Sequence, residues 1–405
     1  MKLKPYEAYK DSGVESLGSV PNGWILTRLK FIASSIKGKN PPEILDEQAD
    51  GSLPYLSMDY LRGQVEPKFA YIDKSSCKVD DGKVLLLWDG ANAGEFIKGK
   101  SGILSSTSAL LNPSSTLQKD YFWFYCKTIE HDVRRQAIGM GIPHVNGDEL
   151  KSTVFAKPSF DEQQQIATFL DRQTTKIDTL ISKQEKLIAL LQENRQAVIL
   201  HAVTKGLNPD APMKDSGVEW LGMVPTHWKV MQLRHMASIK NGSDYKHVEC
   251  ELGEYPVIGS GGEFKRASDY IYDGVSVLLG RKGTIDKPLY IEGKFWVVDT
   301  MFYTIIKDIV LPKYVFNCAK IIPFNLLSTG TALPSMTQND LKQLQLALPE
   351  SKLEQGETIA FIDDKTAKID TLIEKAKHSI ELSKEHRSAL ISAAVTGKID
   401  VREAV

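Results

Sequence analysis

Two stretches of this chain repeat one another, and the repeat limits the folds that the chain can adopt. Residues 10–34 read KDSGVESLGSVPNGWILTRLKFIAS, and residues 214–238 read KDSGVEWLGMVPTHWKVMQLRHMAS. The hexapeptide KIDTLI occurs at residues 176–181 and again at residues 368–373. Each copy spans about 200 residues, far more than the repeating unit of a solenoid. We therefore expect two copies of one domain arrangement in this chain of 405 residues.

Each copy ends in a long segment with a helical pattern of apolar residues. Ser159 precedes Glu162 by three positions, and Ser351 precedes Glu354 by three. In such a capping box the serine accepts a hydrogen bond from the first turn, and the glutamate reaches back to the cap. Apolar residues then recur at spacings of three and four without a proline, as in a coiled coil. The residues expected to form the helix-pairing stripes are Ile177, Ile181, Ile188, Val198, Ile369, Ile373, Ile380 and Leu390.

The two helical segments are expected to pair with each other. In the alignment of the two stripes, Gln184 matches Ala376 and Leu191 matches Ser383, so that the stripes complement one another. The connection that follows the first helical segment is short, residues 206–212. The simplest closed arrangement is an antiparallel coiled coil with one globular domain at each end and pseudo-twofold symmetry. The alternative is two helices that bind separate partners.

The segments before the helices predict α/β (α+β) globular domains. Short apolar runs at residues 53–57, 84–89 and 275–280 are typical of strands, and residues 120–136 favour a helix. We therefore expect four segments. They are a first globular domain over 1–158, a first long helix over 159–206, a second globular domain over 207–350, and a second long helix with a C-terminal tail over 351–405.

One stretch fits the phosphate-binding pattern G-x-x-x-x-G-K-[ST]: residues 94–101 read GEFIKGKS. A P-loop needs a helix directly after the pattern, so that the helix N-terminus faces the phosphate. Residues 102–113 read GILSSTSALLNP, which favours a strand instead. The second copy keeps Gly293 and Lys294 but does not repeat the whole pattern. We interpret residues 97–100 as a β-hairpin turn.

Other catalytic signatures are incomplete. Residues 40–43 read NPPE, close to the Asn-Pro-Pro-aromatic motif with which adenine methyltransferases hold a flipped base, but the aromatic residue is missing. The sequence contains no glycine-rich cofactor loop after a strand, no nucleophile elbow and no metal-ligand spacing. The sequence therefore predicts a binding scaffold that has no catalytic residues and needs no cofactor of its own.

Composition excludes several classes of protein. The 50 Lys and Arg residues balance 51 Asp and Glu residues, so any site for a polyanion must be local. The N-terminus lacks the apolar region of a signal peptide, and no apolar run is long enough for a bilayer. Cys77, Cys126, Cys250 and Cys318 are scattered, which favours buried, reduced thiols. We expect a cytoplasmic protein.

The arrangement resembles the specificity subunits of type I restriction-modification enzymes, in which two target-recognition domains alternate with two helical repeats. The resemblance covers nearly the whole chain. It is carried by the openings at residues 11–24 and 215–228, the helix starts P-S-x-x-E-Q and P-E-S-x-x-E-Q, and KIDTLI in both helices. Within the domains, YPVIGSGGEF at 255–264, LLGRKG at 278–283 and WDGANAGEF at 88–96 are similar to recurring target-recognition motifs.

The resemblance implies that each domain reads one half of a bipartite site on double-stranded DNA. It also implies that the helices set the distance between the halves and recruit two methyltransferase subunits. Those partners would bind S-adenosylmethionine and methylate adenine at N6, and restriction or motor subunits would use ATP and magnesium. Lengthening the first helix by four residues after Thr204 is expected to lengthen the DNA spacer by one or two base pairs.

The DNA-binding residues are predicted from charge alone, because recognition domains vary. Basic residues in loops can bind phosphates or guanine edges. The candidates are Lys98, Lys100, Arg134 and Arg135 in the first domain, and Lys265, Arg266, Arg281 and Lys282 in the second. Two other functions stay open: a coiled-coil structural protein that binds neither DNA nor a methyltransferase, and a nucleotide-binding enzyme that uses Lys100.

Overall fold

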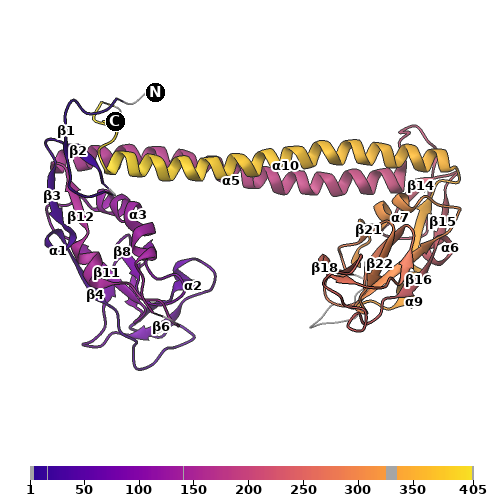
Figure 1. The fold of residues 1–405 in the computed structure, drawn as a ribbon, viewed down its shortest axis with the longest axis horizontal. Coiled ribbons are helices and arrows are strands. Elements are labelled where there is room, and N and C mark those ends of the chain that lie inside the picture. Colours follow the sequence, from indigo (N-terminus) through magenta and orange to yellow (C-terminus); the bar gives the residue numbers. More distant parts are fainter. Residues whose placement is uncertain (1–3, 16, 140, 325–334, 404–405) are drawn as a thin grey trace. The chain divides into compact units, whose positions relative to one another are not determined.

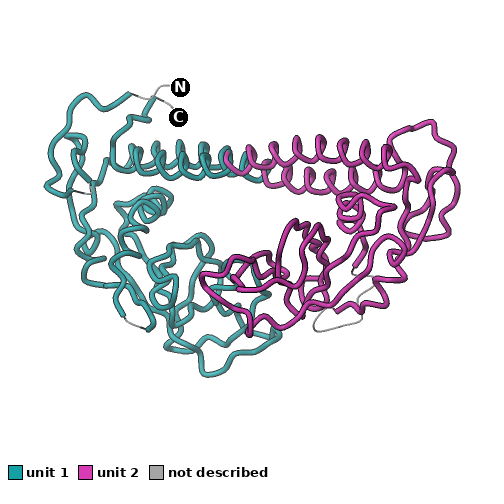
Figure 2. Tube along the Cα trace, turned by 45° about the vertical axis from the view of Figure 1, so that its right-hand side comes forward, with its two compact units in different colours: residues 1–183, 379–405 teal, residues 184–378 magenta. Residues whose placement is uncertain are grey.

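A computed structural model describes residues 4–15, 17–139, 141–324 and 335–403. The chain divides into two compact units (Figure 2). Unit 1 contains residues 1–183 and 379–405, and unit 2 contains residues 184–378. The division cuts through both long helices, α5 (Phe160–Lys205) and α10 (Lys352–Val395). Each unit therefore combines one globular domain with one end of each long helix.

The globular part of unit 1, drawn in indigo and purple in Figure 1, contains two four-stranded sheets by strand pairing. The strand order is β6-β5-β10-β7 in one sheet and β4-β11-β8-β9 in the other. The strands of these sheets are β4 (Ala33–Lys37), β5 (Ser52–Leu56), β6 (Lys68–Tyr71), β7 (Lys78–Val79), β8 (Val84–Leu87), β9 (Phe96–Lys98), β10 (Gly102–Leu104) and β11 (Ser108–Pro113). The pair β5–β10 is parallel, and the other pairs are antiparallel.

Short strands and helices complete unit 1. The strands are β1 (Tyr9–Asp11), which pairs with β2 (Ser19–Pro21), and β3 (Ile25–Arg28), which pairs with β12 (Val154–Lys157). The helices are α1 (Leu29–Ile32), α2 (Met58–Leu61), α3 (Lys119–Arg135) and α4 (Gly147–Ser152). The apolar face of α3, with the buried Tyr121, Phe122 and Tyr125, packs in the same core as Ile166 and Leu170 of α5.

Unit 2 repeats this topology strand for strand. Its sheets have the orders β18-β17-β22-β19 and β16-β23-β20-β21, again with one parallel pair, β17–β22. These strands are β16 (Ala237–Asn241), β17 (Tyr255–Gly259), β18 (Gly262–Ala267), β19 (Tyr272–Asp273), β20 (Ser276–Gly280), β21 (Leu289–Ile291), β22 (Lys294–Val297) and β23 (Met301–Ile306). The remaining elements are β13 (Met213–Asp215), β14 (Met223–Pro225), β15 (Lys229–Gln232), β24 (Gln345–Leu348), α6 (Leu233–Met236), α7 (Pro312–Ala319) and α9 (Gln338–Gln343).

The long helices run antiparallel within each unit. In unit 1, Arg387 Nε of α10 lies 2.9 Å from Asp178 Oδ1 of α5, and Ile391 shares the core with Ile166. In unit 2, Arg195 Nε of α5 lies 3.0 Å from Asp370 Oδ1 of α10. The second ion pair is the duplicate of the first, because both the aspartates and the arginines are 192 positions apart. The fold class expected from the sequence is confirmed: two copies of an α/β domain, joined by two long helices that pair antiparallel.

The start of each long helix is fixed to its own domain by the same side chains. Glu162 accepts hydrogen bonds from Trp24 Nε1 at 3.1 Å and from the Tyr6 hydroxyl at 2.8 Å. Glu354 accepts one from Trp228 Nε1 at 2.7 Å. The capping box was therefore wrong in its glutamate half, because each glutamate binds an indole instead of reaching back to the cap. The serine half is confirmed for Ser159, which accepts from the Glu162 amide at 3.3 Å.

The other helix start differs in detail from the expectation. Ser351 accepts from the amide of Leu353, at 3.2 Å, and not from that of Glu354. Directly after each glutamate, a fully buried glutamine joins the helix to the preceding loops. Gln163 accepts from the Gln118 amide at 2.8 Å, and Gln355 accepts from the Leu311 amide at 2.8 Å.

Two smaller expectations were wrong. Residues 97–100 do not form a hairpin turn, because β9 and β10 belong to different sheets and do not pair with each other. A short apolar run looks the same whether its neighbour in the sequence is its partner or not. Of the four free cysteines, Cys126 and Cys318 are buried as expected, but Cys77 and Cys250 are only half-buried.

Candidate nucleic-acid interface

The strands β8 and β20 are followed by two loops that share one backbone arrangement. We call residues 88–90 of unit 1 the WDG loop and residues 281–283 of unit 2 the RKG loop. The amides of Trp88 and Asp89 both donate to the carbonyl of Thr107, at 2.8 and 3.1 Å. The amides of Arg281 and Lys282 both donate to the carbonyl of Thr300, at 2.9 and 3.2 Å. The two loops therefore place their side chains at equivalent positions.

A second segment adds to each loop in the same way. Val145 donates its amide to the carbonyl of Trp88 at 2.9 Å, and Met336 donates to that of Arg281 at 3.0 Å. The third residue is a glycine with positive φ in both loops, 112° at Gly90 and 83° at Gly283. Glycine adopts this conformation without strain. The backbone arrangement is thus the same in both units, whereas the two residues before the glycine differ.

The RKG loop carries two cations. Arg281 Nη1 donates to the carbonyl of Asp299 at 3.2 Å, and its guanidinium lies 6.0 Å from the centre of the Phe302 ring. The side chain of Lys282 is exposed and makes no hydrogen bond or ion pair within the part of the chain that the structure describes. Among the predicted DNA-binding residues, these two lie together at a loop surface.

The WDG loop carries a different set of groups. Lys37 Nζ lies 2.7 Å from Asp89 Oδ2 and 6.0 Å from the centre of the Trp88 ring. Nearby, Ile142 is 71% exposed, although residues 138 and 144, which flank it, are held in isolated β-bridges. A cation, a carboxylate, an indole and an exposed aliphatic side chain are all groups that contact base edges in DNA complexes.

The other basic candidates of unit 1 contact the protein itself. Lys98 Nζ lies 5.5 Å from the Trp123 ring centre. Lys100 Nζ lies 4.2 Å from the Tyr60 ring centre and donates to the Tyr60 carbonyl at 3.1 Å. The chain then enters strand β10 and not a helix, so Lys100 does not belong to a P-loop.

At the end of helix α3, two more candidates face acidic partners. Arg134 lies 3.4 Å from Glu95 Oε2, and Arg135 lies 3.5 Å from Asp132 Oδ1. In unit 2, Lys265 Nζ lies 2.7 Å from Glu249 Oε1, and this hydrogen bond raises the pKa of the lysine. Arg266 Nη1 lies 3.4 Å from Glu263 Oε1. The sequence grouped the eight residues by charge, and the structure distributes them over four separate places.

Sequence reasoning missed Lys37 and Asp89. Asp89 carries the charge opposite to the one that was sought, and Lys37 precedes it by 52 positions, at the end of β4. One signal was available. Aligning WDG with RKG on the glycine would have placed Asp89 opposite Lys282 and exposed the two positions that differ. Asn40, from the NPPE sequence, accepts hydrogen bonds from the Tyr55 hydroxyl at 2.8 Å and the Ser106 amide at 3.2 Å, which is a structural role.

The predicted helix-pairing residues lie along one stripe of each long helix. On α10, Ile369, Ile373 and Ile380 are buried, and Leu390 is half-buried. On α5, Ile177, Ile181, Ile188 and Val198 are all half-buried. The stripe of α10 is therefore covered more fully than that of α5, although the two sequences are duplicates.

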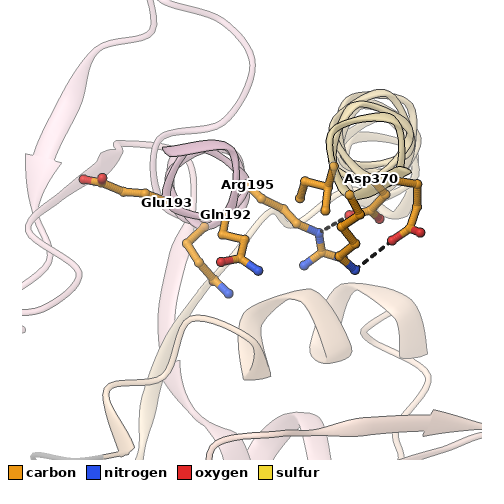
Figure 3. Close-up of a pocket in the computed structure, with 8 residues that line it drawn as sticks. Gln192, Glu193, Arg195 and Asp370 are labelled. Carbon is orange, nitrogen blue, oxygen red and sulfur yellow. Dashed lines mark hydrogen bonds and ion pairs between the residues drawn. The ribbon is translucent and has the colours of Figure 1, made fainter. Parts of the chain in front are cut away.

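A polar groove of about 600 Å³ follows the helix pair of unit 2 (Figure 3). Arg195 of α5 reaches toward Asp370 of α10 across it, while Glu193 points away from α10. Ile373 and Lys377 also line the groove. Because Arg195 is already paired with Asp370, its guanidinium is not free to bind a ligand in the groove.

None of the helices in the described ranges has both the length and the apolar character that a membrane span requires. No group of His, Cys, Asp and Glu side chains among these residues is arranged to hold a metal ion.

Comparisons with known proteins agree on one family. The profile described as "Type I restriction modification DNA specificity domain" matches residues 21–189 and 225–382. The chain is 30% identical to the type I restriction enzyme MjaVIII specificity subunit of Methanocaldococcus jannaschii, over 97% of both chains. It is 21% identical to the MjaIX specificity subunit of the same organism, over 96% of both chains.

Solved structures share the fold. One comes from a study of complex assembly and conformational transition of the type I R-M system, with a TM-score of 0.72 and 14% identity over 93% of this chain and 98% of the other. Another is the HsdS subunit from Thermoanaerobacter tengcongensis, with a TM-score of 0.52 and 14% identity over 94% of this chain and 98% of the other.

Proposed function

Because the chain belongs to the type I restriction-modification DNA specificity family, we propose that it reads a bipartite DNA target, one half with each globular domain. A specificity subunit is not itself catalytic, since catalysis in these systems resides in other subunits. The observation that carries the proposal is the pair of equivalent loops. One scaffold presents Trp88 and Asp89 in unit 1 but Arg281 and Lys282 in unit 2. Two domains that bind different half-sites require different side chains at equivalent positions, and these loops provide them.

The partners follow from the same proposal. Two adenine-N6 methyltransferase subunits bind the long helices, one for each copy of the duplicated helical sequence, and restriction or motor subunits join that complex. S-adenosylmethionine then binds in the methyltransferase subunits, and ATP with magnesium binds in the motor subunits. The prediction that this chain has no cofactor of its own belongs to this proposal. Purification with a co-expressed methyltransferase subunit tests it, with an expected ratio of two methyltransferases to one specificity chain.

We also propose that the long helices set the distance between the two half-sites. Helix α5 has 46 residues, which corresponds to ~69 Å at ~1.5 Å per residue. An insertion after Thr204 is a poor test, because Thr204 is buried beside the Ala202 and Val203 side chains in the core of unit 2. Seven residues preserve the coiled-coil repeat, and they need to enter both helices. In the register fixed by the two ion pairs, an insertion after Lys183 is matched by one after Glu381.

The double insertion adds ~10 Å to each helix, or about three base pairs of DNA at ~3.4 Å each. We expect methylation of the same two half-sites with a spacer longer by about three base pairs. Efficiency should be lower, because three base pairs also rotate one half-site by roughly 100°. Methylome sequencing of cells that carry the variant and the methyltransferase gives the answer. An unchanged spacer at full efficiency, or new bases within a half-site, would contradict the proposal.

The coiled-coil structural protein is the alternative. It predicts that the purified complex protects no DNA and that no methyltransferase is recovered with the chain. A nucleotide-binding enzyme that uses Lys100 is not supported, because this lysine is bound to the Tyr60 carbonyl and the required helix is a strand.

A further inference from the structure

The WDG and RKG loops are the places where two equivalent backbones carry different chemistry. Each loop is held by three equivalent backbone hydrogen bonds and ends in a glycine with positive φ. A side chain added at Gly90 or Gly283 would meet open space, so neither glycine is needed for packing. The glycines instead keep the conformation of the loop, while the two preceding side chains are free to differ without changing the fold.

We propose that residues 88–89 and 281–282 are specificity-determining positions, and that the two loops read chemically opposite base edges. This inference rests on the proposed DNA-reading function and adds the residues and the base chemistry. In unit 2 the loop offers only donors, from Arg281 and Lys282. In unit 1 the loop offers the Asp89 carboxylate, which only accepts when ionised.

Base edges in the major groove match these groups. Guanine presents two acceptors, N7 and O6, to which arginine and lysine donate. Cytosine presents an amino group at N4, which donates to a carboxylate. The RKG loop therefore reads a guanine in its half-site, and Asp89 of the WDG loop reads the amino group of a cytosine in the other half-site.

The surroundings of each loop support this assignment. Arg281 uses one nitrogen to donate to the Asp299 carbonyl, which holds the guanidinium in place and leaves its other N–H groups for a base. Asp89 is 2.7 Å from Lys37 Nζ. The lysine stands beside the carboxylate as a donor for the guanine of the same base pair. Lys37 Nζ also lies 6.0 Å from the centre of the Trp88 ring, so this lysine stands beside both side chains of the WDG loop.

The test uses the complex of the chain with its co-expressed methyltransferase and reads all methylated sites by methylome sequencing. The variants are Arg281→Gln and Lys282→Ala in unit 2, and Asp89→Asn in unit 1. Each is expected to relax one base pair in one half-site, with roughly 10- to 100-fold less discrimination, and to leave the other half-site unchanged. Lys282→Ala keeps the test valid if Arg281→Gln folds poorly, because the Lys282 side chain is exposed.

Lys229→Ala is the matched control. This lysine is also basic and exposed in unit 2, but it lies on β15 and pairs with Glu350. It is expected to leave the recognised bases unchanged. Unchanged discrimination at both half-sites in Arg281→Gln and Lys282→Ala would overturn the inference for unit 2, and so would a relaxed base in Lys229→Ala alone. A relaxed base that proves not to be a guanine would also overturn it.

Unchanged discrimination in Asp89→Asn overturns the assignment of the WDG loop. Failure of the proposed function looks different from either result: the unaltered chain would then direct methylation to no bipartite sequence at all.

Discussion

The two units have the same backbone hydrogen bonds in the loops after β8 and β20, yet the side chains of these loops differ. Their helix starts are the same, with Glu162 bound to Trp24 and Glu354 bound to Trp228. Their loops after β8 and β20 have the same backbone but opposite charge, with Asp89 in one and Lys282 in the other. The duplication therefore kept the contacts that hold the domain together and changed the side chains that those contacts present. A rigid frame allows the surface chemistry to vary without loss of the fold.

The largest expected effect is the loss of stability when a methyl group is added at two tightly packed glycines, one in each unit. A Cβ added at Gly38 would lie 2.2 Å from the Ser105 carbonyl oxygen, and one at Gly242 would lie 2.0 Å from that of Val298. We expect Gly38→Ala and Gly242→Ala each to lower the free energy of unfolding by about 3 kcal/mol, because backbone blocks the new methyl group. Urea denaturation measures the loss.

Gly23→Ala in unit 1 and Gly261→Ala in unit 2 are the controls, since a Cβ there meets no atom within 4 Å. They are expected to change stability by less than about 0.5 kcal/mol. A large loss in only one of the two close-approach variants would show that the frames are not equivalent.

The second prediction concerns a difference between duplicate residues of the long helices. Ile373 is 7% exposed, whereas its counterpart Ile181 is half-buried. Ile373→Asp is expected to cost about 2.5 kcal/mol and Ile181→Asp about 1 kcal/mol, since a carboxylate near solvent keeps more of its hydration. Thermal melting followed by circular dichroism ranks the two. Leu372→Asp, at a side chain that is 50% exposed, is the control and should be nearly neutral. Equal losses at 181 and 373 would contradict the burial difference.

The third prediction returns to a shared feature. Gln163 and Gln355 are fully buried, and each accepts a hydrogen bond from a backbone amide at the start of α3 or α7, respectively. Replacing either by leucine leaves those groups unpaired, and we expect a loss of about 2 kcal/mol in each case. Gln164→Leu, next in the chain but exposed, serves as the reference. Denaturation midpoints that stay unchanged in the Gln163 and Gln355 variants would remove these residues from the shared frame.

The smallest expected effect is a difference in the pH dependence of stability between two equivalent lysines. Lys127 of α3 forms an ion pair with Glu130. Its counterpart Lys320 has the Asn317 amide oxygen at 3.4 Å instead. Burial, together with the nearby Arg195, lowers the pKa of Lys320 from its ordinary value of 10.5 to about 8.

Between pH 8 and 10.5 the unfolded chain therefore binds more protons at Lys320 than the folded chain does, so this lysine makes stability rise with pH in that window. We expect Lys320→Met to reduce that rise, by less than about 1 kcal/mol because the amine is partly screened by water. Urea midpoints at pH 7.5 and pH 10 measure it. Lys127→Met, which loses the Glu130 partner, is expected to destabilise instead. A rise with pH that is the same in Lys320→Met as in the unaltered chain would contradict the expectation.

The sequence predicted the architecture well because duplication and helical periodicity are both written in the order of residues. KIDTLI and the apolar stripes were sufficient for the long helices and their antiparallel pairing. Strand partners were harder, as residues 97–100 show, because β9 pairs with the preceding strand β8, whereas β10 pairs with β5, whose partner residues are 48 positions away in the chain. The glutamates failed for the same reason. The position of Glu162 fitted a local capping box, but its carboxylate instead accepts a hydrogen bond from Trp24, 138 positions away in the chain.

The DNA-binding candidates show another limit. Choosing residues by charge found Arg281 and Lys282, but it also found Lys100, whose amine is used by Tyr60. It did not select Asp89, because a negative charge repels the DNA phosphates and the neighbouring Lys37 is known only from the structure. Whether a charge is available to a ligand depends on its neighbours in space, and those neighbours follow only from the fold.

The bond from Glu162 to the Trp24 indole has a mechanical consequence. It fixes the direction in which a helix of 46 residues leaves its domain. A rod of ~69 Å is a lever, and a tilt of one degree at its base moves its tip by ~1.2 Å. The buried Trp24 indole and the fully buried Gln163 therefore hold the base of α5 in its orientation relative to its domain. Their stiffness limits how much a small angular error at the base is magnified at the tip.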